Sequence, residues 1–195
     1  KGLSGGTITV WPLMSSPLTA SENTIIGNTV LYGATDGFLF ASGRAGERFA
    51  VRNSGASVVV EGCGSNGCEY MTGGVAVILG GIGANFGAGM TGGMAYVYDP
   101  EGVAEDFMNF ESILTCAVGH PHWEMQVKGL ITRHHVETGS QIAERILSNW
   151  ENERRNFVQI CPREMLARPE VVALFGFAGT ANVTQLLTDG VLAGL

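Results

Sequence analysis

Two glycine-rich stretches match the GxGxxG pattern of dinucleotide-binding loops, at residues 62–67 and 87–92. In such a site the pyrophosphate lies on the N-terminal amides of a helix that opens at the loop. After Gly67 only a short segment precedes the next glycine pair, and after Gly92 an apolar run follows almost at once. Neither stretch leaves room for that helix, so we predict no nucleotide site from the pattern.

Four cysteines could carry metal or redox chemistry: Cys63, Cys68, Cys116 and Cys161. Cys63 and Cys68 lie close together, but no third cysteine is near them in sequence to complete a set of cluster ligands. The chain is too long to need disulfide staples. The pattern therefore predicts reduced thiols, buried or facing each other, in a compartment like the cytosol.

The histidines could form a zinc site with Cys116, because His120, His122, His134 and His135 all fall between positions 120 and 135. His134 and His135 are adjacent, however, so their side chains diverge on a helix. The carboxylates among them follow no pattern, and we interpret the group as a polar helix end. Cys116 and His120 are the nearest nucleophile–base pair, and their spacing is poor support for nucleophilic catalysis.

Five charged residues could be read as an acid–base constellation. They are Glu47, Arg48, Arg52, Glu61 and Glu69. In a repeating fold they fall on different coils and corners, so we expect ion pairs between coils or contacts with a neighbouring domain. The sequence thus predicts no catalytic residue, no cofactor-binding residue and no metal ligand in this chain.

The spacing of the glycines indicates the structural elements that position these residues. Of the 29 glycines, 21 lie between positions 1 and 100, which indicates a change of architecture near position 100. Three segments align on Gly55, Gly74 and Gly93, with a constant spacing of 19 positions. Gly37 lies 18 positions upstream and Gly6 a further 31, which fits a Pro/Ser/Thr-rich loop at residues 12–24. The spacing indicates about five coils.

Each repeat is a glycine turn followed by β-branched and apolar residues, and the intervals are too short for a crossover helix. The pattern predicts a mainly β fold, a right-handed parallel β-helix with a C-terminal helical cap. A second strand per coil is expected at residues 29–32 and 49–52. Glycines are expected at structural corners, with positive φ at the pairs Gly73-Gly74 and Gly92-Gly93. Gly83 does not follow the period, so its substitution by alanine is expected to destabilise the fold only mildly. The corner glycines are Gly6, Gly37, Gly55, Gly73, Gly74, Gly92 and Gly93. A β-sandwich is the alternative, but its strands would alternate in polarity and need no glycine pair at this period.

The run at residues 46–99, with GERFAVRNSGA and GCEYMTGG, resembles the C-terminal domain of the glutamate synthase large subunit. IIGNTVLYGATDG and residues 134–165 resemble the parts on either side, so the resemblance covers about residues 3–165. It implies a β-helix without catalytic residues in an oxidoreductase of glutamate biosynthesis and ammonia assimilation. That enzyme takes ammonia from glutamine, passes it through an internal tunnel and aminates 2-oxoglutarate. Cys63, Asn66 and Gly87 depart from the family pattern, and none of them stands at a family catalytic position.

The resemblance also implies the parent enzyme's cofactors and partners. FMN and an iron–sulfur cluster would lie in other domains, with FAD and NADPH on a small subunit in bacterial forms, and electrons would come from NAD(P)H or ferredoxin. The β-helix would be a scaffold between the amidotransferase and the FMN barrel, in the cytoplasm or a plastid, with contacts to the small subunit or ferredoxin as a further expectation. The alternatives are a stand-alone β-helix interaction module, a protein like a formylmethanofuran dehydrogenase subunit, or a small nucleotide-dependent enzyme.

We expect three parts: a parallel β-helix over residues 1–115, a helical cap and closing strand over 116–165, and a tail of unknown role over 166–195. Helices are expected at about 122–135 and 138–156, the second with a capping box from Thr138 and Gln141. They are expected to cover the open end of the solenoid. The first coil has no such cap in the sequence, so residues 1–24 are expected to fray or self-associate.

Charge and hydropathy exclude several partners. The formal net charge is −7 and no basic patch is present, which argues against nucleic acid and anionic membranes. The first residues, KGLSGG, contain no apolar signal core. Residues 171–188 carry no charge, but glycines and polar residues dilute them, so no membrane span is expected.

Overall fold

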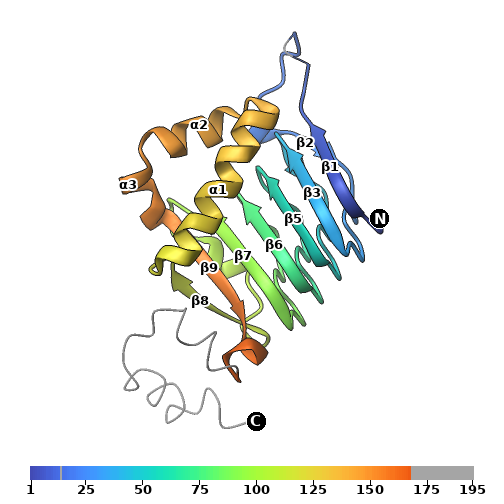
Figure 1. Cartoon of the computed structure of the whole chain (residues 1–195), viewed down its shortest axis with the longest axis vertical. Coiled ribbons are helices and arrows are strands. Elements are labelled where there is room, and N and C mark those ends of the chain that lie inside the picture. Colours follow the sequence, from blue (N-terminus) through green and yellow to red (C-terminus); the bar gives the residue numbers. More distant parts are fainter. Residues whose placement is uncertain (14, 168–195) are drawn as a thin grey trace.

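A stack of five parallel strands forms the centre of the computed structural model, which describes residues 1–13 and 15–167 (Figure 1). The strands are β1 (Ser4–Val10), β3 (Asp36–Ala41), β5 (Ser54–Val60), β6 (Thr72–Ile78) and β7 (Gly92–Tyr98). From β3 onward, paired positions on neighbouring strands are separated by the sequence period to within one residue, as in the pair of Phe38 and Ser57. The predicted mainly β fold, a parallel β-solenoid, is confirmed.

The inserted loop after β1 explains the longer first interval. Thr7 of β1 pairs with Phe38 of β3, although the sequence separation between them exceeds one period. The intervening chain contains the short turn η1 (Ala20–Glu22) and β2 (Thr24–Ile26), which pairs in parallel with β4 (Arg44–Ala45). The loop is thus an excursion from a coil and leaves the repeat intact.

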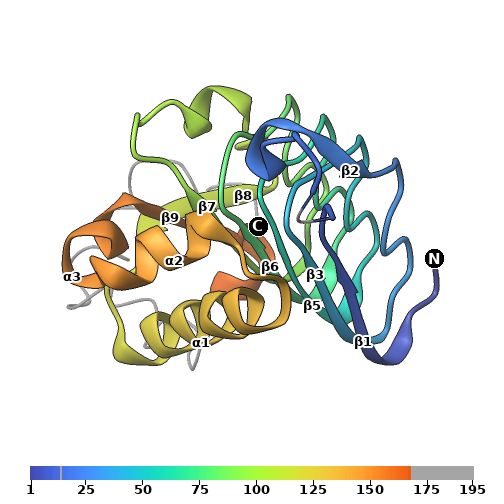
Figure 2. The same ribbon diagram turned by 90° about the horizontal axis from the view of Figure 1, so that it is seen from above.

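Helices and two antiparallel strands follow the solenoid in the chain. Strand β9 (Phe157–Pro162) pairs antiparallel with β7, and β8 (Ile113–Ala117) pairs antiparallel with β9, so the sheet order is β1-β3-β5-β6-β7-β9-β8. Helix α1 (Pro121–Thr138) lies across the outer face of the sheet against β1, β3, β5 and β6 (Figure 2). The strand edge of the last coil is therefore continued by β9, and the helices cover a face of the sheet.

The helix expected at residues 138–156 is interrupted. Gly139, at φ +65°, ends α1, and its N–H donates to the carbonyl of His135 (2.8 Å). Ser140 caps the next helix by accepting from the N–H of Ala143 (3.2 Å), so the expected capping box of Thr138 and Gln141 is wrong. The segments are α2 (Gln141–Ser148), α3 (Trp150–Glu153) and the 3₁₀ turn η3 (Arg154–Asn156), and two further 3₁₀ turns are η2 (Ala104–Phe107) and η4 (Arg163–Ala167).

Each strand in the middle of the solenoid is buried on both faces near its end, which explains its nearly continuous apolar run. Val58 and Val60 point into the coil interior, whereas Val59 faces the layer beneath the helices. The interior is closed by the opposite side of each coil, and the outer layer is closed by α1, α2 and α3. The sheet therefore separates two apolar cores, one inside the solenoid and one between the sheet and the helices.

The second strand predicted at residues 29–32 and 49–52 is wrong. These segments are turns in which every second residue has positive φ, for example Leu31 at 62° and Ala50 at 56°. Their N–H groups still bond to the next coil, as in Thr29 N–H to the Glu47 carbonyl (2.8 Å). Left-handed residues at alternate positions bend the chain back across the coil, which an extended strand could not do, while the backbone groups stay paired.

Two different constraints favour glycine at the corners. Gly6, Gly37, Gly74 and Gly93 have φ between +77° and +97°. The positive φ expected at Gly73 and Gly92 is not found; there, a Cβ would overlap the carbonyl of the preceding coil, as it would at Gly55. A register shift accompanies the corner in β1, β5 and β6, as in a β-bulge. The expected mildness of Gly83 is contradicted, because a Cβ there would overlap the backbone of Gly64 and Ser65.

Two expectations concern residues near the C-terminus. Most of the tail at 166–195 and the uncharged stretch at 171–188 lie outside the described residues. Within residues 1–13 and 15–167, no helix has the length and apolar character needed to cross a membrane.

Candidate functional site between the solenoid and the helices

A buried carboxylate lies where the solenoid meets the helices. Ser42 and Glu61 directly follow β3 and β5 and occupy equivalent positions on adjacent coils. The Ser42 hydroxyl donates to Glu61 Oε1 (2.9 Å), and the Glu61 N–H donates to the Gly43 carbonyl (2.9 Å). Glu61 is only 2% exposed. The solenoid thus buries one carboxylate at the carboxyl end of an internal strand.

Two residues from the helices complete this group. The Ser140 hydroxyl donates to the same Glu61 Oε1 (2.5 Å) while its oxygen caps α2. His134, from α1, places Nε2 3.6 Å from Oε1. We call Ser42, Glu61, His134 and Ser140 the Glu61 junction, since it connects two adjacent coils with α1 and the start of α2. Hydrogen bonds to a carboxylate are stronger than those between neutral groups, so the junction adds strong polar contacts between the solenoid and the helices.

The polar groups of the Glu61 junction are incompletely paired. His134 is fully buried, and neither ring nitrogen has a hydrogen-bond partner among the described residues. Its ring lies 6.1 Å from that of Phe40, in the outer core. A buried polar group without a partner costs free energy, and such positions are uncommon in native proteins. A buried carboxylate beside an unpaired imidazole therefore distinguishes the junction from the apolar outer core around it.

A hollow of about 490 Å³ opens beside the Glu61 junction. Ser42, Glu61, Thr138 and Gln141 line one side, and the loop after β1 lines the other. That loop projects beyond the strand ends near the turn from α1 to α2 (Figure 1). It contributes the exposed side chains of Trp11, Leu13 and Leu18. The lining thus combines one carboxylate and several hydroxyls with large apolar side chains, which suits a small amphipathic group.

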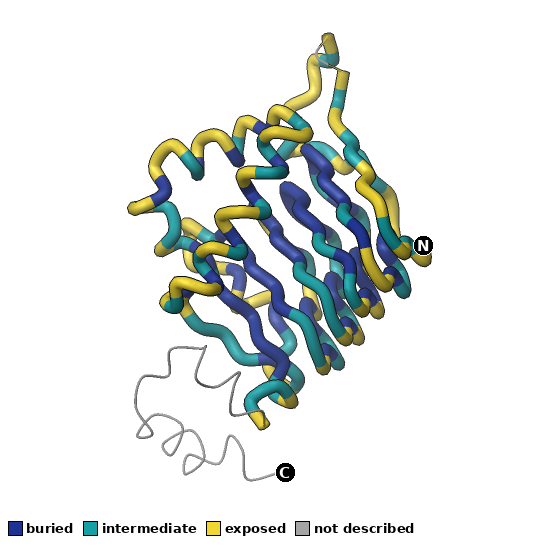
Figure 3. Tube along the Cα trace, viewed as in Figure 1, coloured by how far each residue is buried: buried dark blue, intermediate teal, exposed yellow. Residues whose placement is uncertain are grey.

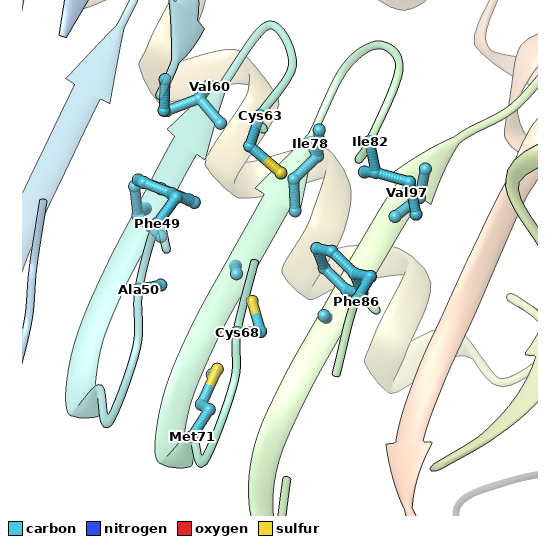
Figure 4. Close-up of a cluster of buried hydrophobic side chains, with 14 of the residues drawn as sticks. Phe49, Ala50, Val60, Cys63, Cys68, Met71, Ile78, Ile82, Phe86 and Val97 are labelled. Carbon is cyan, nitrogen blue, oxygen red and sulfur yellow. The ribbon is translucent and has the colours of Figure 1, made fainter. Parts of the chain in front are cut away.

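The cysteines lie apart from this hollow. Cys63 and Cys68 point into the coil interior beside Phe49 and Phe86 (Figure 4), and both thiols are free. Burial raises the pKa of the Cys63 thiol to about 12 and raises the pKa of Cys68 well above its usual range. Burial also raises the pKa of Cys161 to about 12 and the pKa of Cys116 to about 11. Because the thiolate is the nucleophile and the metal ligand, these thiols are poorly suited to either role at neutral pH.

The histidines are not brought together. His120 caps α1, with Nδ1 accepting from the His122 N–H (3.1 Å). His135 Nδ1 lies 3.1 Å from the Ser140 carbonyl, while His134 turns into the outer core. Across the described part of the chain, no group of three or more His, Cys, Asp or Glu side chains is placed to hold a metal.

The charged residues separate in the same way. Arg48 pairs with Glu69 of the next coil (3.3 Å), and Arg52 lies over the rings of Tyr32 and Tyr70 (5.9 and 6.0 Å). Of the five, Glu61 is the one that contacts the helices. The glycine stretches at 62–67 and 87–92 lead into turns and into β6 and β7, with no helix opening at either.

The Glu61 junction was missed from the sequence. The sequence predicts an ion pair between coils or a contact with a neighbouring domain for Glu61, and a polar helix end for His134. The separation of one period between Ser42 and Glu61 is a signal that they are neighbours on adjacent coils. No comparable signal links them to His134 and Ser140, because those residues lie outside the repeat.

Comparison with known proteins decides the family. A family model for the GXGXG motif matches residues 1–163 of the chain. The chain belongs to the GXGXG family. The chain is also 63% identical, over 171 residues, to the glutamate synthase [NADPH] large chain of Azospirillum brasilense. This match covers 88% of the present chain and 11% of the relative. The resemblance inferred from the sequence is confirmed.

Eukaryotic relatives give the same result. The GXGXG chain is 52% identical over 167 residues to glutamate synthase [NADH] of Schizosaccharomyces pombe, covering 86% of this chain and 8% of that one. It is 46% identical over 184 residues to ferredoxin-dependent glutamate synthase 1 of Arabidopsis thaliana, covering 94% of this chain and 11% of that one. The chain thus spans about a tenth of the length of these relatives.

Proposed function

We propose that this GXGXG chain is a non-catalytic scaffold domain of a glutamate synthase large subunit. It would support an amidotransferase domain and an FMN-binding domain of the same polypeptide, and those domains would convert glutamine and 2-oxoglutarate into two glutamates. The observation that carries the proposal is the similarity of nearly the whole chain to one segment of glutamate synthase large chains.

The chemistry of the described residues supports a structural role. The reactive side chains that the sequence singled out are buried in the coil or used in contacts between coils, like Cys63 and the Arg48–Glu69 pair. A solenoid buries its core by stacking coils, so it forms a rigid body with long flat sides. Such a body is suited to holding neighbouring domains at a fixed separation.

The cofactors that glutamate synthase implies do not fit the described residues. An iron–sulfur cluster needs thiolate ligands, whereas Cys63 and Cys68 are closed into the coil interior with pKa values far above neutrality. FMN would need a phosphate site, whereas both GxGxxG stretches lead into turns and strands. We therefore assign FMN, the cluster and the electron donor to other parts of the enzyme.

Calorimetry on the 195-residue chain tests the proposal. Titration with FMN, NADPH, NADH and glutamine in turn is expected to give no saturable heat. A micromolar dissociation constant for any of the four would contradict a purely structural role. In the full-length enzyme, a substitution that unfolds the solenoid is expected to separate glutamine hydrolysis from glutamate formation. Tight coupling of the two activities in an enzyme with an unfolded solenoid would argue against the scaffold.

A further inference from the structure

The hollow beside Glu61 contains one charged lining residue among those the structure describes, and its charge is negative. We propose that this hollow binds a protonated primary amine carried on an aliphatic stem, with Glu61 as its counter-ion. This site is separate from the scaffold role and would exist whether or not that role is correct.

The nearest basic group to Glu61 in the junction is His134, whose Nε2 lies 3.6 Å from Oε1 and makes no hydrogen bond to it. The contacts of Ser42, Ser140 and His134 with Glu61 all end on Oε1, and Oε2 takes part in none of them. Removing a carboxylate from water is costly unless it is paired with a positive charge. A cation entering the hollow would meet Glu61 in its lining and lower that cost.

The polar part of the lining suits an ammonium group. The hydroxyls of Ser42 and Thr138 and the carboxamide of Gln141 offer oxygen acceptors beside Glu61. An ammonium has three N–H donors and no acceptor, so it can use several such oxygens at once. No lysine, arginine or histidine is among the described lining residues, so no cation lines the hollow to repel it.

The apolar part of the lining selects an organic cation over a metal ion. Trp11, Leu13 and Leu18 of the loop and Ile142 of α2 are the large apolar residues of the lining. Ca²⁺ takes six to eight oxygen ligands, usually with several carboxylates, and one carboxylate with hydroxyls falls short of that set. An aliphatic stem would instead bury methylene groups against these residues, and the Trp11 ring can contact either the stem or the charge.

Two sources share this chemistry. The amine is either a free small molecule or a lysine side chain from a part of the enzyme outside this chain, since the relatives are about ten times longer. A zwitterion such as glutamine is disfavoured in both cases, because its own carboxylate would lie close to Glu61.

Titration of the ¹⁵N-labelled chain with n-butylammonium chloride, followed by amide chemical shifts, tests the site. We expect saturable shifts at Ser42, Gly139 and Ser140 with a dissociation constant of roughly 1–10 mM, about 3–4 kcal/mol. Glu61→Gln should weaken binding at least ~10-fold, because the ion pair is lost. Glu111→Gln, which removes an exposed carboxylate away from the hollow, should leave it unchanged.

Chemical controls separate the charge from the stem. 1-Butanol, tetramethylammonium chloride and glutamine should each bind at least ~10-fold more weakly than n-butylammonium. Equal shifts with 1-butanol, or shifts that Glu61→Gln does not alter, would overturn the proposal. If Glu61→Gln does not fold, Trp11→Ala on the exposed loop is the second variant. It should weaken binding severalfold at an unchanged melting temperature, and unchanged affinity would count against the site.

A lysine analogue distinguishes the two sources. Nα-acetyl-lysine N-methylamide carries the same stem and ammonium with peptide groups attached. Tighter binding of this analogue than of n-butylammonium would assign the hollow to a lysine side chain, and equal or weaker binding would assign it to a free amine. Absence of saturable shifts with both compounds would overturn the proposal.

Discussion

The interior of the solenoid and the Glu61 junction are built in opposite ways. The interior stacks equivalent residues of successive coils, with apolar side chains such as Val58 and Ala76 paired in register. The junction joins Ser42 and Glu61 of the repeat to His134 and Ser140, which lie outside it. Its contacts connect distant parts of the chain and end on a charged atom.

The difference explains where change is tolerated. In the interior each coil rests directly on its neighbour, so even one extra carbon at a corner meets backbone that cannot move aside. In the junction a substitution changes the polar partners of a buried carboxylate, and a hollow lies beside it. We therefore expect substitutions in the interior to act on stability, and substitutions in the Glu61 junction to act on polar contacts beside the hollow.

Gly74→Val should have the largest effect on the interior. Gly74 has φ +81°, and a side chain there would overlap the Ala56 carbonyl and approach Asn53 Nδ2. Strain and overpacking together should cost about 3–5 kcal/mol, enough to unfold a marginal domain. Urea unfolding measures it. Gly129→Ala is the control, since its Cβ meets open space in a helix, and it should stabilise by up to about 1 kcal/mol. Similar stability of the two variants would disprove the corner assignment.

Gly83→Ala should cost about 1–3 kcal/mol. A Cβ at Gly83 would overlap the backbone of Gly64 and Ser65 on the preceding coil. The same substitution at Gly27, where a Cβ meets open space, should change stability by less than about 0.5 kcal/mol. If the melting temperatures of the two variants match, close stacking of coils does not extend to the loops.

The buried thiols should make the interior sensitive to alkali. The pKa of Cys63 is about 12 when folded and about 9 as an ordinary thiol, because burial disfavours the thiolate. Between these values the unfolded chain binds fewer protons, so stability is complete below about pH 9 and falls as the pH rises. Cys63 contributes at most about 1.4 kcal/mol per pH unit. Denaturation at a series of pH values from about 8 to about 10.5 should show a shallower decline for Cys63→Ala, and parallel declines would refute this.

The smallest effect is a difference in protection along the sheet. Strand β1 is an edge strand with mostly exposed residues, whereas β6 lies between β5 and β7 and is more deeply buried (Figure 3). Amides of residues 7–10 should exchange faster than those of 75–79, because opening an edge breaks fewer contacts. Hydrogen exchange with NMR detection measures both. Uniform protection across the two strands would mean that another surface covers β1.

The repeat was readable from the sequence because it is local and periodic. Glycine spacing and apolar runs predicted the parallel strands, and the spacing of Gly6 and Gly37 predicted the inserted loop. The second side of each coil was not predictable in the same way. Leu31, Ala50 and Cys68 adopt positive φ, although such residues normally avoid it. Hydrogen bonds between coils impose that conformation against the preference of the side chain.

The sequence by itself determined the solenoid, its period and the family, because stacking requires the same residue types at the same position of each coil. Only the tertiary structure decided where the helices lie and which polar groups they cover. Glu61 and His134 are far apart in the chain and share no period, so their meeting follows from α1 packing across the sheet. Apolar burial positions that helix, and burial carries no information about which polar side chains will be trapped beneath it.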